Sequence, residues 1–260
     1  MTGFSPDFAG AKVRPSPNFS ARQGVDAPDM IILHYTGMPT AAAAGARLCD
    51  PASEVSSHYL VHEDGYIVQM VAESQRAWHA GRSFWQGETD INSHSVGIEI
   101  VNPGHEFGYR DFPSGQIAAV IDLCRDICAR HGILAERVLA HSDVAPGRKI
   151  DPGEKFPWGT LASHGVGHFV EAVPLVQEGA PAESADQILE LQRMLARYGY
   201  TVEPSGLADA ATTPVVAAFQ RHFRPARVDG IADWSTVETA RRLLAALPQS
   251  AEEGILVARG

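Results

Sequence analysis

The sequence predicts a mixed α/β domain followed by a small three-helix domain, and three observations support this fold class. Short apolar runs with strand-like alternation are interspersed with helical patterns before residue 162. Residues 163–184 lose this periodicity and gain Gly, Ala, Pro and Glu, as linkers do. Apolar residues then recur at helical spacing. We therefore assign 1–162 to a first domain, 163–184 to a linker, 185–248 to a second domain and 249–260 to a tail.

The first domain is expected to contain a mixed central sheet flanked by helices. Asp64-Gly65 separates two β-rich runs and is typical of a hairpin turn. A helix is expected to begin with Ser114 as its cap and to stop at Gly132, with its apolar face against the sheet. The expected strands are 30–34, 59–61, 66–70, 96–101 and 138–141, and an alanine-rich helix is expected near 40–49.

The second domain shows three helical segments. The first has one apolar face and is stopped by Gly199. Thr213-Pro214 begins the second, because proline is favoured in the first turn of a helix. The third is expected over 236–244.

Composition argues against some classes of binding partner and favours one cellular compartment. The chain has 260 residues, 45% of them hydrophobic, and a net charge of −10, which argues against nucleic acid and anionic membranes as partners. Residues 1–29 show no export signal, and no stretch is long and apolar enough to span a membrane. The chain has an odd number of cysteines, namely Cys49, Cys124 and Cys128. The last two share the apolar face of the 114–131 helix. We therefore expect a cytoplasmic protein, with the periplasm as the alternative.

Two histidines and an aspartate form the most informative set. His34 ends one apolar run, and His141 ends another. A Pro/Gly-rich loop after His141 can bring Asp151 back toward it. Two imidazoles and a carboxylate form a typical ligand set of catalytic zinc, which keeps its fourth position for water, whereas structural zinc is closed by four ligands. The set therefore predicts a zinc site that supports hydrolysis.

Two charged residues accompany this set. Glu99 lies in an alternating strand pattern on the face opposite Ile98 and Ile100, where a carboxylate suggests a functional role. Lys149 lies two residues before Asp151. Hydrolysis needs a charge that stabilises a developing anion and a group that moves a proton. An ammonium and a carboxylate beside the metal suit these two tasks.

Five ordered blocks carry a resemblance to a known family. They are I-I-L-H-Y-T-G, V-S-S-H-Y-L-V-H-E-D-G, W-H-A-G-R-S-F-W-Q-G, N-S-H-S-V-G-I-E-I-V-N and H-S-D-V-A-P-G-R-K-I-D-P-G, and they span most of residues 30–158. Together they resemble the zinc-dependent N-acetylmuramoyl-L-alanine amidases, which include phage lysozyme-type amidases and peptidoglycan recognition proteins. Five blocks in order are more specific than any single short motif.

This resemblance implies a role for each matching residue. It makes His34, His141 and Asp151 the zinc ligands, Glu99 the acid/base and Lys149 the cationic partner. It also implies a cleft at one edge of the sheet. The positions expected to contact a muropeptide substrate are Tyr35, His58, Trp78, His79 and Asn92. Trp78 and Trp85 either line the groove, which the resemblance favours, or pack loops, and residues 79–94 are expected to move over the groove.

The implied activity is hydrolysis of the amide between N-acetylmuramic acid and the L-alanine of the stem peptide, in peptidoglycan recycling. In the family's cytosolic members an asparagine follows the first histidine, whereas here Tyr35 does. The choice between 1,6-anhydro and ordinary muramyl substrates therefore stays open, and a broader cell-wall amidase is an alternative. A non-catalytic muropeptide receptor and a zinc peptidase are further alternatives, although a receptor does not need the complete set of metal and acid/base residues found here.

The second domain resembles the peptidoglycan-binding domain common on wall hydrolases. The segments L-Q-R-M-L-A-R-Y-G-Y, A-A-F-Q-R-H-F and V-D-G-I-A-D-W-S-T carry this resemblance, and Gln192 and Gln220 occupy repeated positions within it. The domain either binds peptidoglycan fragments or only packs against the first domain. Tyr200, Phe223 and Trp234 are either ligand contacts or core residues.

Overall fold

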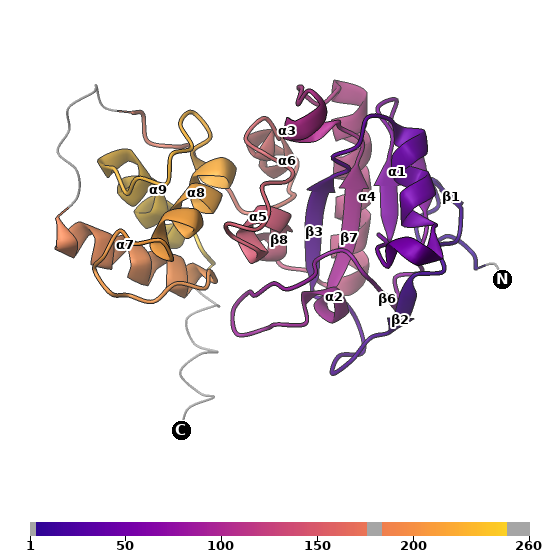
Figure 1. Ribbon diagram of the computed structural model, residues 1–260, viewed down its shortest axis with the longest axis horizontal. Helices are drawn as coiled ribbons and strands as arrows, with labels where there is room; N and C mark the ends of the chain where they lie inside the picture. The colour runs from indigo at the N-terminus through magenta and orange to yellow at the C-terminus, as the bar shows by residue number, and fades with distance from the viewer. Residues whose placement is uncertain (1–3, 176–183, 249–260) are drawn as a thin grey trace.

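The computed structural model describes residues 4–175 and 184–248. It contains a six-stranded sheet in the order β1-β5-β4-β7-β3-β8 and a separate two-stranded sheet of β2 and β6 (Figure 1). The strands are β1 Ala11–Val13, β2 Phe19–Ala21, β3 Met30–Tyr35, β4 Tyr59–Val61, β5 Ile67–Gln69, β6 Gln75–Ala77, β7 Ser95–Ile100 and β8 Val138–Ala140. All neighbours in the large sheet run parallel except β4 and β5, so the expected mixed sheet is confirmed.

The helices are distributed between the two domains. Those of the first domain are α1 Ala41–Leu48, α2 Ile91–His94, α3 Gly104–Phe107, α4 Ser114–His131, α5 His141–Val144 and α6 Trp158–Ser163, with short 3-10 turns at Pro51–Ser53 and Ala135–Arg137. Those of the second domain are α7 Ala185–Tyr198, α8 Thr212–Phe223 and α9 Trp234–Ala245. The three-helix prediction for the second domain is therefore confirmed among the described residues.

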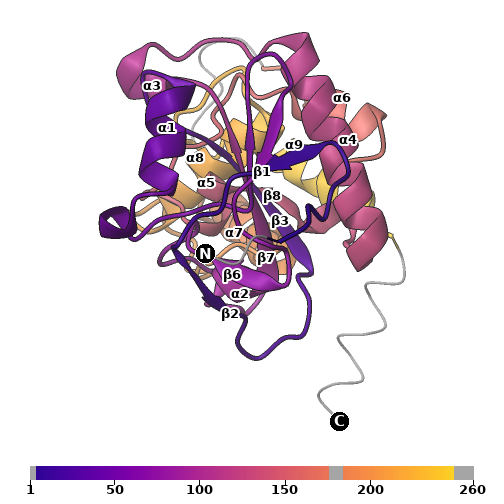
Figure 2. The same ribbon diagram turned by 90° about the vertical axis from the view of Figure 1, so that its right-hand side faces the viewer.

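The two faces of the large sheet are covered differently. Alternate residues of β3 point to opposite faces. Ile31 and Leu33 pack in the core that α4 closes, while Met30 and Ile32 pack in a core shared with the second domain. Leu48 of α1 packs on the same side as the second domain, further along the sheet. Figure 2 shows α1 and α4 on opposite sides of the strands.

One continuous apolar core therefore joins the two domains. Leu139 of β8 contributes to it together with Leu191 of α7, Phe219 of α8 and Leu243 of α9, and all four side chains are buried. This arrangement explains why the 30–33 run is apolar on both faces, as the sequence of a doubly covered strand should be. The second domain is packed onto the first rather than tethered beside it (Figure 1).

The two glutamines of the second domain occupy equivalent structural positions. The Oε1 atom of Gln192 accepts the N–H of Gly206, and that of Gln220 accepts the N–H of Gly230. The Nε2 atom of each donates to the backbone carbonyl that follows the glycine. Each buried side-chain amide thus closes the loop that follows its helix. The repeated glutamines therefore have the same structural role.

The element boundaries correct the sequence-based expectations at several points. The hairpin at Asp64-Gly65 and the stop at Gly132 are confirmed, but Pro113 occupies the cap position of α4 and Ser114 is its first residue. The short strands β1, β2 and β6 had no clear sequence pattern. Val173, in the expected linker, is buried and its N–H donates to the hydroxyl of Thr239. Residues 176–183 and the expected tail 249–260 lie outside the described residues.

In the part of the chain that the structure describes, no helix has the length and apolar character needed to cross a membrane. The cysteines all lie in described segments, and none of them forms a disulfide. Cys124 is fully buried in the core beneath α4, and Cys128 packs at the edge of that core. Both are therefore core residues, as the helical pattern predicts.

Candidate active site

Strand register brings the first two residues of the set together. His34 is paired with Glu99 across β3 and β7, and Leu33 is paired with Ala140 across β3 and β8, which places His141 directly beyond its own strand and next to His34. The carboxyl ends of neighbouring parallel strands meet at one edge of a sheet, where α/β folds usually bind ligands. The chain returns after α5, and the backbone N–H of Ser142 donates to the carbonyl of Asp151.

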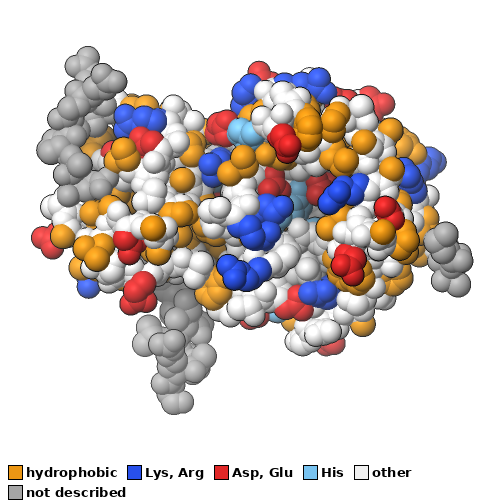
Figure 3. Space-filling model, in the orientation of Figure 1, with side chains coloured by type: hydrophobic (Ala, Val, Ile, Leu, Met, Phe, Trp, Pro, Cys, Tyr) orange, Lys and Arg blue, Asp and Glu red, His pale blue; other side chains and the backbone are white. Residues whose placement is uncertain are grey.

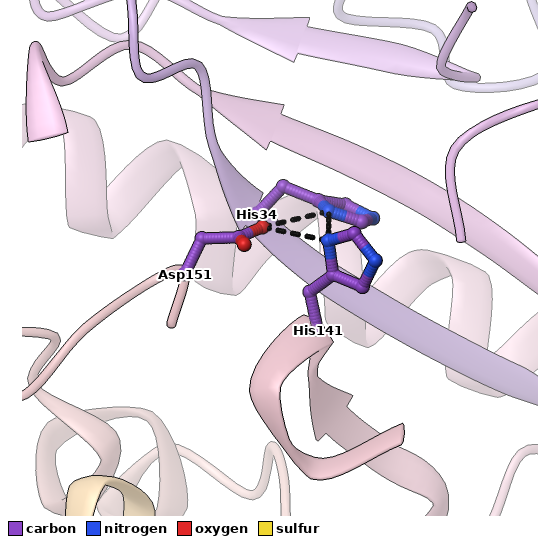
Figure 4. Close-up of side chains that lie close together, drawn as sticks. All are labelled: His34, His141 and Asp151. Carbon is purple, nitrogen blue, oxygen red and sulfur yellow. Dashed lines mark hydrogen bonds and ion pairs between the residues drawn. The ribbon is translucent and has the colours of Figure 1, made fainter. Parts of the chain in front are cut away.

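Three side-chain atoms converge at this edge. Nδ1 of His34 lies 2.9 Å from Nδ1 of His141 and 3.0 Å from Oδ2 of Asp151, and Nδ1 of His141 lies 2.9 Å from the same oxygen. Figure 4 shows the three side chains pointing toward one another. All three residues are buried. Ligands about 2 Å from a tetrahedral ion lie roughly 3.3 Å apart, so the spacing suits a small divalent metal.

The outer nitrogen of His34 leads into a chain of hydrogen bonds. Nε2 of His34 lies 3.0 Å from Nδ1 of His79, and Nε2 of His79 lies 3.2 Å from the hydroxyl of Ser95. Ser95 donates its own proton to the carbonyl of Ile91 and so accepts from His79. Burial, followed by the charge of His34, lowers the pKa of His79 well below its usual value. A neutral His79 that donates from Nε2 must accept at Nδ1, so His34 donates from Nε2.

The outer nitrogen of His141 is fixed in the same way. Nε2 of His141 lies 3.0 Å from the carbonyl oxygen of Ala80, which can only accept. In the neutral form, each of these two histidines would therefore present an unprotonated Nδ1 to the carboxylate of Asp151. Three lone pairs that meet at one buried point repel each other unless a cation lies between them. The donor set consequently fits a metal ion better than it fits a hydrogen-bonded cluster.

Burial and charge keep His34 and Asp151 in the protonation states that a metal requires. Burial, reinforced by the charge of His141, lowers the pKa of His34 to about 4. Burial opposes ionisation of Asp151, but His141 and His34 beside it hold the pKa of Asp151 well below its usual range. His34 is therefore neutral and Asp151 ionised at neutral pH.

Glu99 stands beside this set with one oxygen unengaged. Its side chain is partly exposed, yet its Oε2 atom is buried and has no hydrogen-bond partner. Burial, followed by the nearby charge of Asp151, raises the pKa of Glu99 well above its usual value, while Lys149 acts in the opposite direction. Buried polar atoms are nearly always paired in folded proteins, so an unpaired carboxylate oxygen beside a pocket indicates a contact made by a reactant.

A pocket of about 350 Å³ opens onto these residues. Figure 3 shows it as a hollow with histidine and acidic side chains at its floor and basic side chains at its rim. Arg47, Arg148 and Lys149 line it. The protein has a net charge of −10, so a group of three cations at one pocket is a local departure from the overall charge, and it offers partners to an acidic ligand group.

Comparison with known families agrees with this site. The family model described as N-acetylmuramoyl-L-alanine amidase matches residues 24–154, and one for a peptidoglycan binding domain matches residues 184–239. The N-acetylmuramoyl-L-alanine amidase AmiD of Escherichia coli is 39% identical over 229 residues, which cover 83% of this chain and 82% of AmiD. The chain belongs to the N-acetylmuramoyl-L-alanine amidase family. The 1,6-anhydro-N-acetylmuramyl-L-alanine amidase AmpD of E. coli is 33% identical and covers 58% of the chain.

Solved structures of the amidase family resemble most of the chain. The complex of E. coli AmiD with the substrate anhydro-N-acetylmuramic acid-L-Ala-D-gamma-Glu-L-Lys has a TM-score of 0.71 and 38% identity, and covers 89% of this chain and 92% of AmiD. AmpDh3 of Pseudomonas aeruginosa, in complex with anhydromuramic pentapeptide, has a TM-score of 0.67 and 30% identity, and covers 94% of this chain and 97% of AmpDh3. Both structural matches extend beyond the first domain into the second.

The expected substrate contacts of this amidase divide into two groups. Tyr35, Trp78 and His79 line the pocket, although both ring nitrogens of His79 are engaged inside the protein. His58 and Asn92 do not line it, and both side chains are engaged inside the protein, so substrate contact at the five expected positions stays a prediction. The buried ring of His58 accepts the N–H of Gly97 and donates to the carbonyl of Gln75. The side-chain oxygen of Asn92 accepts the backbone N–H groups of residues 79 and 80.

For Trp85 the structure contradicts the groove alternative and supports packing. It is fully buried and packs at 4.9 Å from the ring of Tyr200, so it belongs to the contact between the domains rather than to the pocket. Backbone hydrogen bonds further anchor the 79–94 loop, from Phe84 to Val144 and from Gln86 to Gly199. The loop thus contacts the second domain, and the expected movement of residues 79–94 stays a prediction.

No sequence pattern marked some of the pocket residues as functional. Arg47, His105 and Arg148 come from separate segments, and their approach to the site depends on the fold. In the second domain, Tyr200 and Phe223 are buried, which assigns them to the core, while Trp234 is half exposed. Nothing in a single sequence distinguishes these cases, because an aromatic residue suits a core and a binding surface equally well.

Proposed function

We propose that this protein is a zinc enzyme that hydrolyses the amide between the lactyl group of 1,6-anhydro-N-acetylmuramic acid and the L-alanine of a stem peptide. The convergence of His34, His141 and Asp151 beside the unpaired oxygen of Glu99 supports it most strongly. A zinc ion held by these three side chains would supply a Lewis acid and lower the pKa of water at the open position to about 7.

Glu99 and Lys149 supply the remaining chemistry in this proposal. The unpaired oxygen of Glu99 takes a proton from the attacking water and returns it to the amide nitrogen as the C–N bond breaks. The ammonium of Lys149, which lines the same pocket, stabilises the negative charge that develops on the carbonyl oxygen. The products are a free carboxylate on the lactyl group and a free peptide amine.

The ligands in the related structures and the arginines at the pocket rim support the proposed substrate class. The structures of AmiD and AmpDh3 hold anhydromuramyl peptides. In the substrate named for AmiD, the γ-linked glutamate leaves its α-carboxylate free. Arg47 and Arg148 at the rim offer guanidinium groups to such a carboxylate. We propose peptidoglycan recycling as the process, because anhydromuramyl peptides are degradation products rather than intact wall.

Mass spectrometry of the products tests this proposal. The purified protein is incubated with an anhydro-muramyl tetrapeptide and with a reduced muramyl tetrapeptide, each with zinc and after chelation. Release of free tetrapeptide from the anhydro form alone, only with zinc, is the expected result. Release from both substrates would indicate a broader amidase, and fragments cut within the peptide would indicate a peptidase. Zinc binding without any cleavage would point to a receptor and overturn the proposal.

A further inference from the structure

Asp143 is a buried carboxylate that the proposed chemistry does not use. It lies two residues after His141 in α5, and only 1% of its surface is exposed. Its Oδ2 atom accepts the backbone N–H of Ala140 at 2.8 Å, which fixes the start of α5. A carboxyl group at this depth requires further hydrogen-bond partners, because burial without them is strongly unfavourable.

Both further donors come from the second domain. The phenol of Tyr200 donates to Oδ1 of Asp143 at 2.7 Å, and Nδ1 of His222 in α8 donates to Oδ2 at 2.7 Å. Tyr200 and His222 are each 2% exposed. The ring of His222 also stacks on Trp158 of α6 with centroids 3.7 Å apart. The second domain thus reaches the short helix that carries His141.

The α5 helix depends on such contacts because it is a single turn. His141–Val144 comprises four residues, and a helix of this length is not stable by itself. The carbonyl of Val144 accepts the N–H of Phe84. Across the following loop, the backbone of Gly147 approaches Pro214 of α8 so closely that an added Cβ would lie 3.0 Å from the proline ring. The contacts of α5 are therefore shared between the loop 79–94 and the second domain.

We propose that the second domain is a structural part of the metal centre, in which Tyr200 and His222 hold Asp143 and thereby position His141. Tyr200 and His222 are positioning residues, since neither lines the pocket. The inference rests on the proposed function for the identity of the metal, but the contacts to Asp143 do not depend on it. The domain that resembles a peptidoglycan binding module consequently supports catalysis through its contacts with α5.

Tyr200→Phe is the sharpest test, because it removes one hydroxyl and keeps the ring. Tyr198→Phe is the matched control: Tyr198 is also buried and also packs against Trp85, but its hydroxyl contacts His168 instead of Asp143. Three quantities are measured in the full chain: the zinc dissociation constant by chelator competition, hydrogen exchange of residues 138–151 without metal, and urea unfolding. Tyr200→Phe should raise the zinc dissociation constant about tenfold and speed exchange in 138–151, whereas the control should change the constant by less than about twofold.

His222 provides an independent pair of variants. His222→Asn retains an N–H donor toward Asp143, whereas His222→Phe retains an aromatic ring for stacking on Trp158 and loses the donor. Zinc affinity should be closer to wild type in the asparagine variant, although the phenylalanine variant conserves more of the packing. A purely structural role would give the opposite order.

The outcomes separate this inference from the proposed function. If Tyr200→Phe and His222→Phe match the control in zinc affinity and in exchange of 138–151, the second domain contributes stability alone and the inference is overturned. If the wild type binds zinc but cleaves no muropeptide, the proposed function fails while the zinc data still test the positioning. If the wild type binds no zinc, exchange in residues 138–151 still tests the contacts of Asp143.

Discussion

At the residue scale, Glu99 has one carboxylate oxygen buried without a donor, while the ligand set next to it is fully oriented. Under the proposed function, this contrast divides the site into a part that would hold a metal and a part that would act on a reactant. The two parts make different predictions for substitutions, because metal affinity and turnover are separate measurements.

Glu99→Gln should retain zinc and lose turnover. The amide conserves the size of the side chain but cannot take a proton from water, so kcat should fall about a thousandfold. The measurements are kcat on an anhydro-muramyl peptide and zinc content after dialysis. Asp151→Ala is the comparison, since it should lose zinc itself. Turnover within a few-fold of wild type in Glu99→Gln would exclude Glu99 as the acid/base.

His79 should control the orientation of His34. Its Nδ1 atom accepts from Nε2 of His34, so His79→Asn, which places an amide oxygen near that position, should retain most zinc affinity. His79→Leu offers no acceptor and should weaken zinc binding roughly tenfold or more. Chelator competition measures both constants. Equal affinities in the two variants would show that the hydrogen bond to His34 is unimportant.

At the element scale, α4 is joined to the sheet region by a second buried carboxylate. Glu73 is 2% exposed and accepts from the hydroxyl of Tyr59 in β4 at 2.5 Å. Arg130 and His131, at the end of α4, donate to the same carboxylate. Burial opposes its ionisation, but the hydrogen bonds from Arg130, Tyr59 and His131 lower the pKa of Glu73 to about 2.

This cluster predicts an acid-sensitive component of stability. In the unfolded chain Glu73 has its ordinary pKa of 4.5, whereas in the folded protein its pKa is about 2. Between pH 4.5 and pH 2 the unfolded state therefore binds more protons than the folded state. The free energy of unfolding should therefore fall by about 3 kcal/mol from this group as the pH drops from 4.5 to 2. Urea titrations should show a smaller fall for Glu73→Gln.

The exposed Asp126, which also pairs with Arg130, provides the control for that experiment. Asp126→Asn should follow the wild-type pH dependence, because a surface ion pair contributes little. A parallel dependence in Glu73→Gln and wild type would instead place the acid sensitivity elsewhere.

Strand register explains how much of the site was predictable at this scale. His34, Glu99 and His141 end or interrupt recognisable strand patterns, and parallel pairing places such positions side by side. The order of the strands was not predictable, since β1 pairs with β5 and β7 lies between β4 and β3. Pairing between distant segments depends on contacts that a local pattern does not record.

At the scale of the whole molecule, the two domains share one apolar core. Met30, Ile32 and Leu139 of the sheet pack with buried side chains of α7, α8 and α9. Separation of the domains would expose these side chains to water, which is unfavourable by about 25 cal/mol for each Å² of apolar surface. The shared core thus couples the stability of the two domains.

We therefore expect the described domains to unfold in a single transition. Scanning calorimetry should give one peak with equal calorimetric and van't Hoff enthalpies. Leu139→Ala, on the face toward the second domain, should destabilise that single transition by about 3 kcal/mol. Two peaks, with only one of them shifted by Leu139→Ala, would show that the domains fold independently.

Cytoplasmic location stays a prediction. It rests on the odd number of cysteines. Fractionation of cells that express the full-length gene, with antibody detection, measures it directly.

The sequence by itself determined the family, the two-domain organisation and the residues of the metal set, because short motifs and periodicity are local properties of the chain. Only the tertiary structure decided that Trp85 is buried between the domains, that His58 and Asn92 hold the backbone, and that Asp143 is bound by Tyr200 and His222. These roles depend on which distant side chains meet. A polar or aromatic residue has the same identity in a core and in a pocket, and only its packed neighbours distinguish the two.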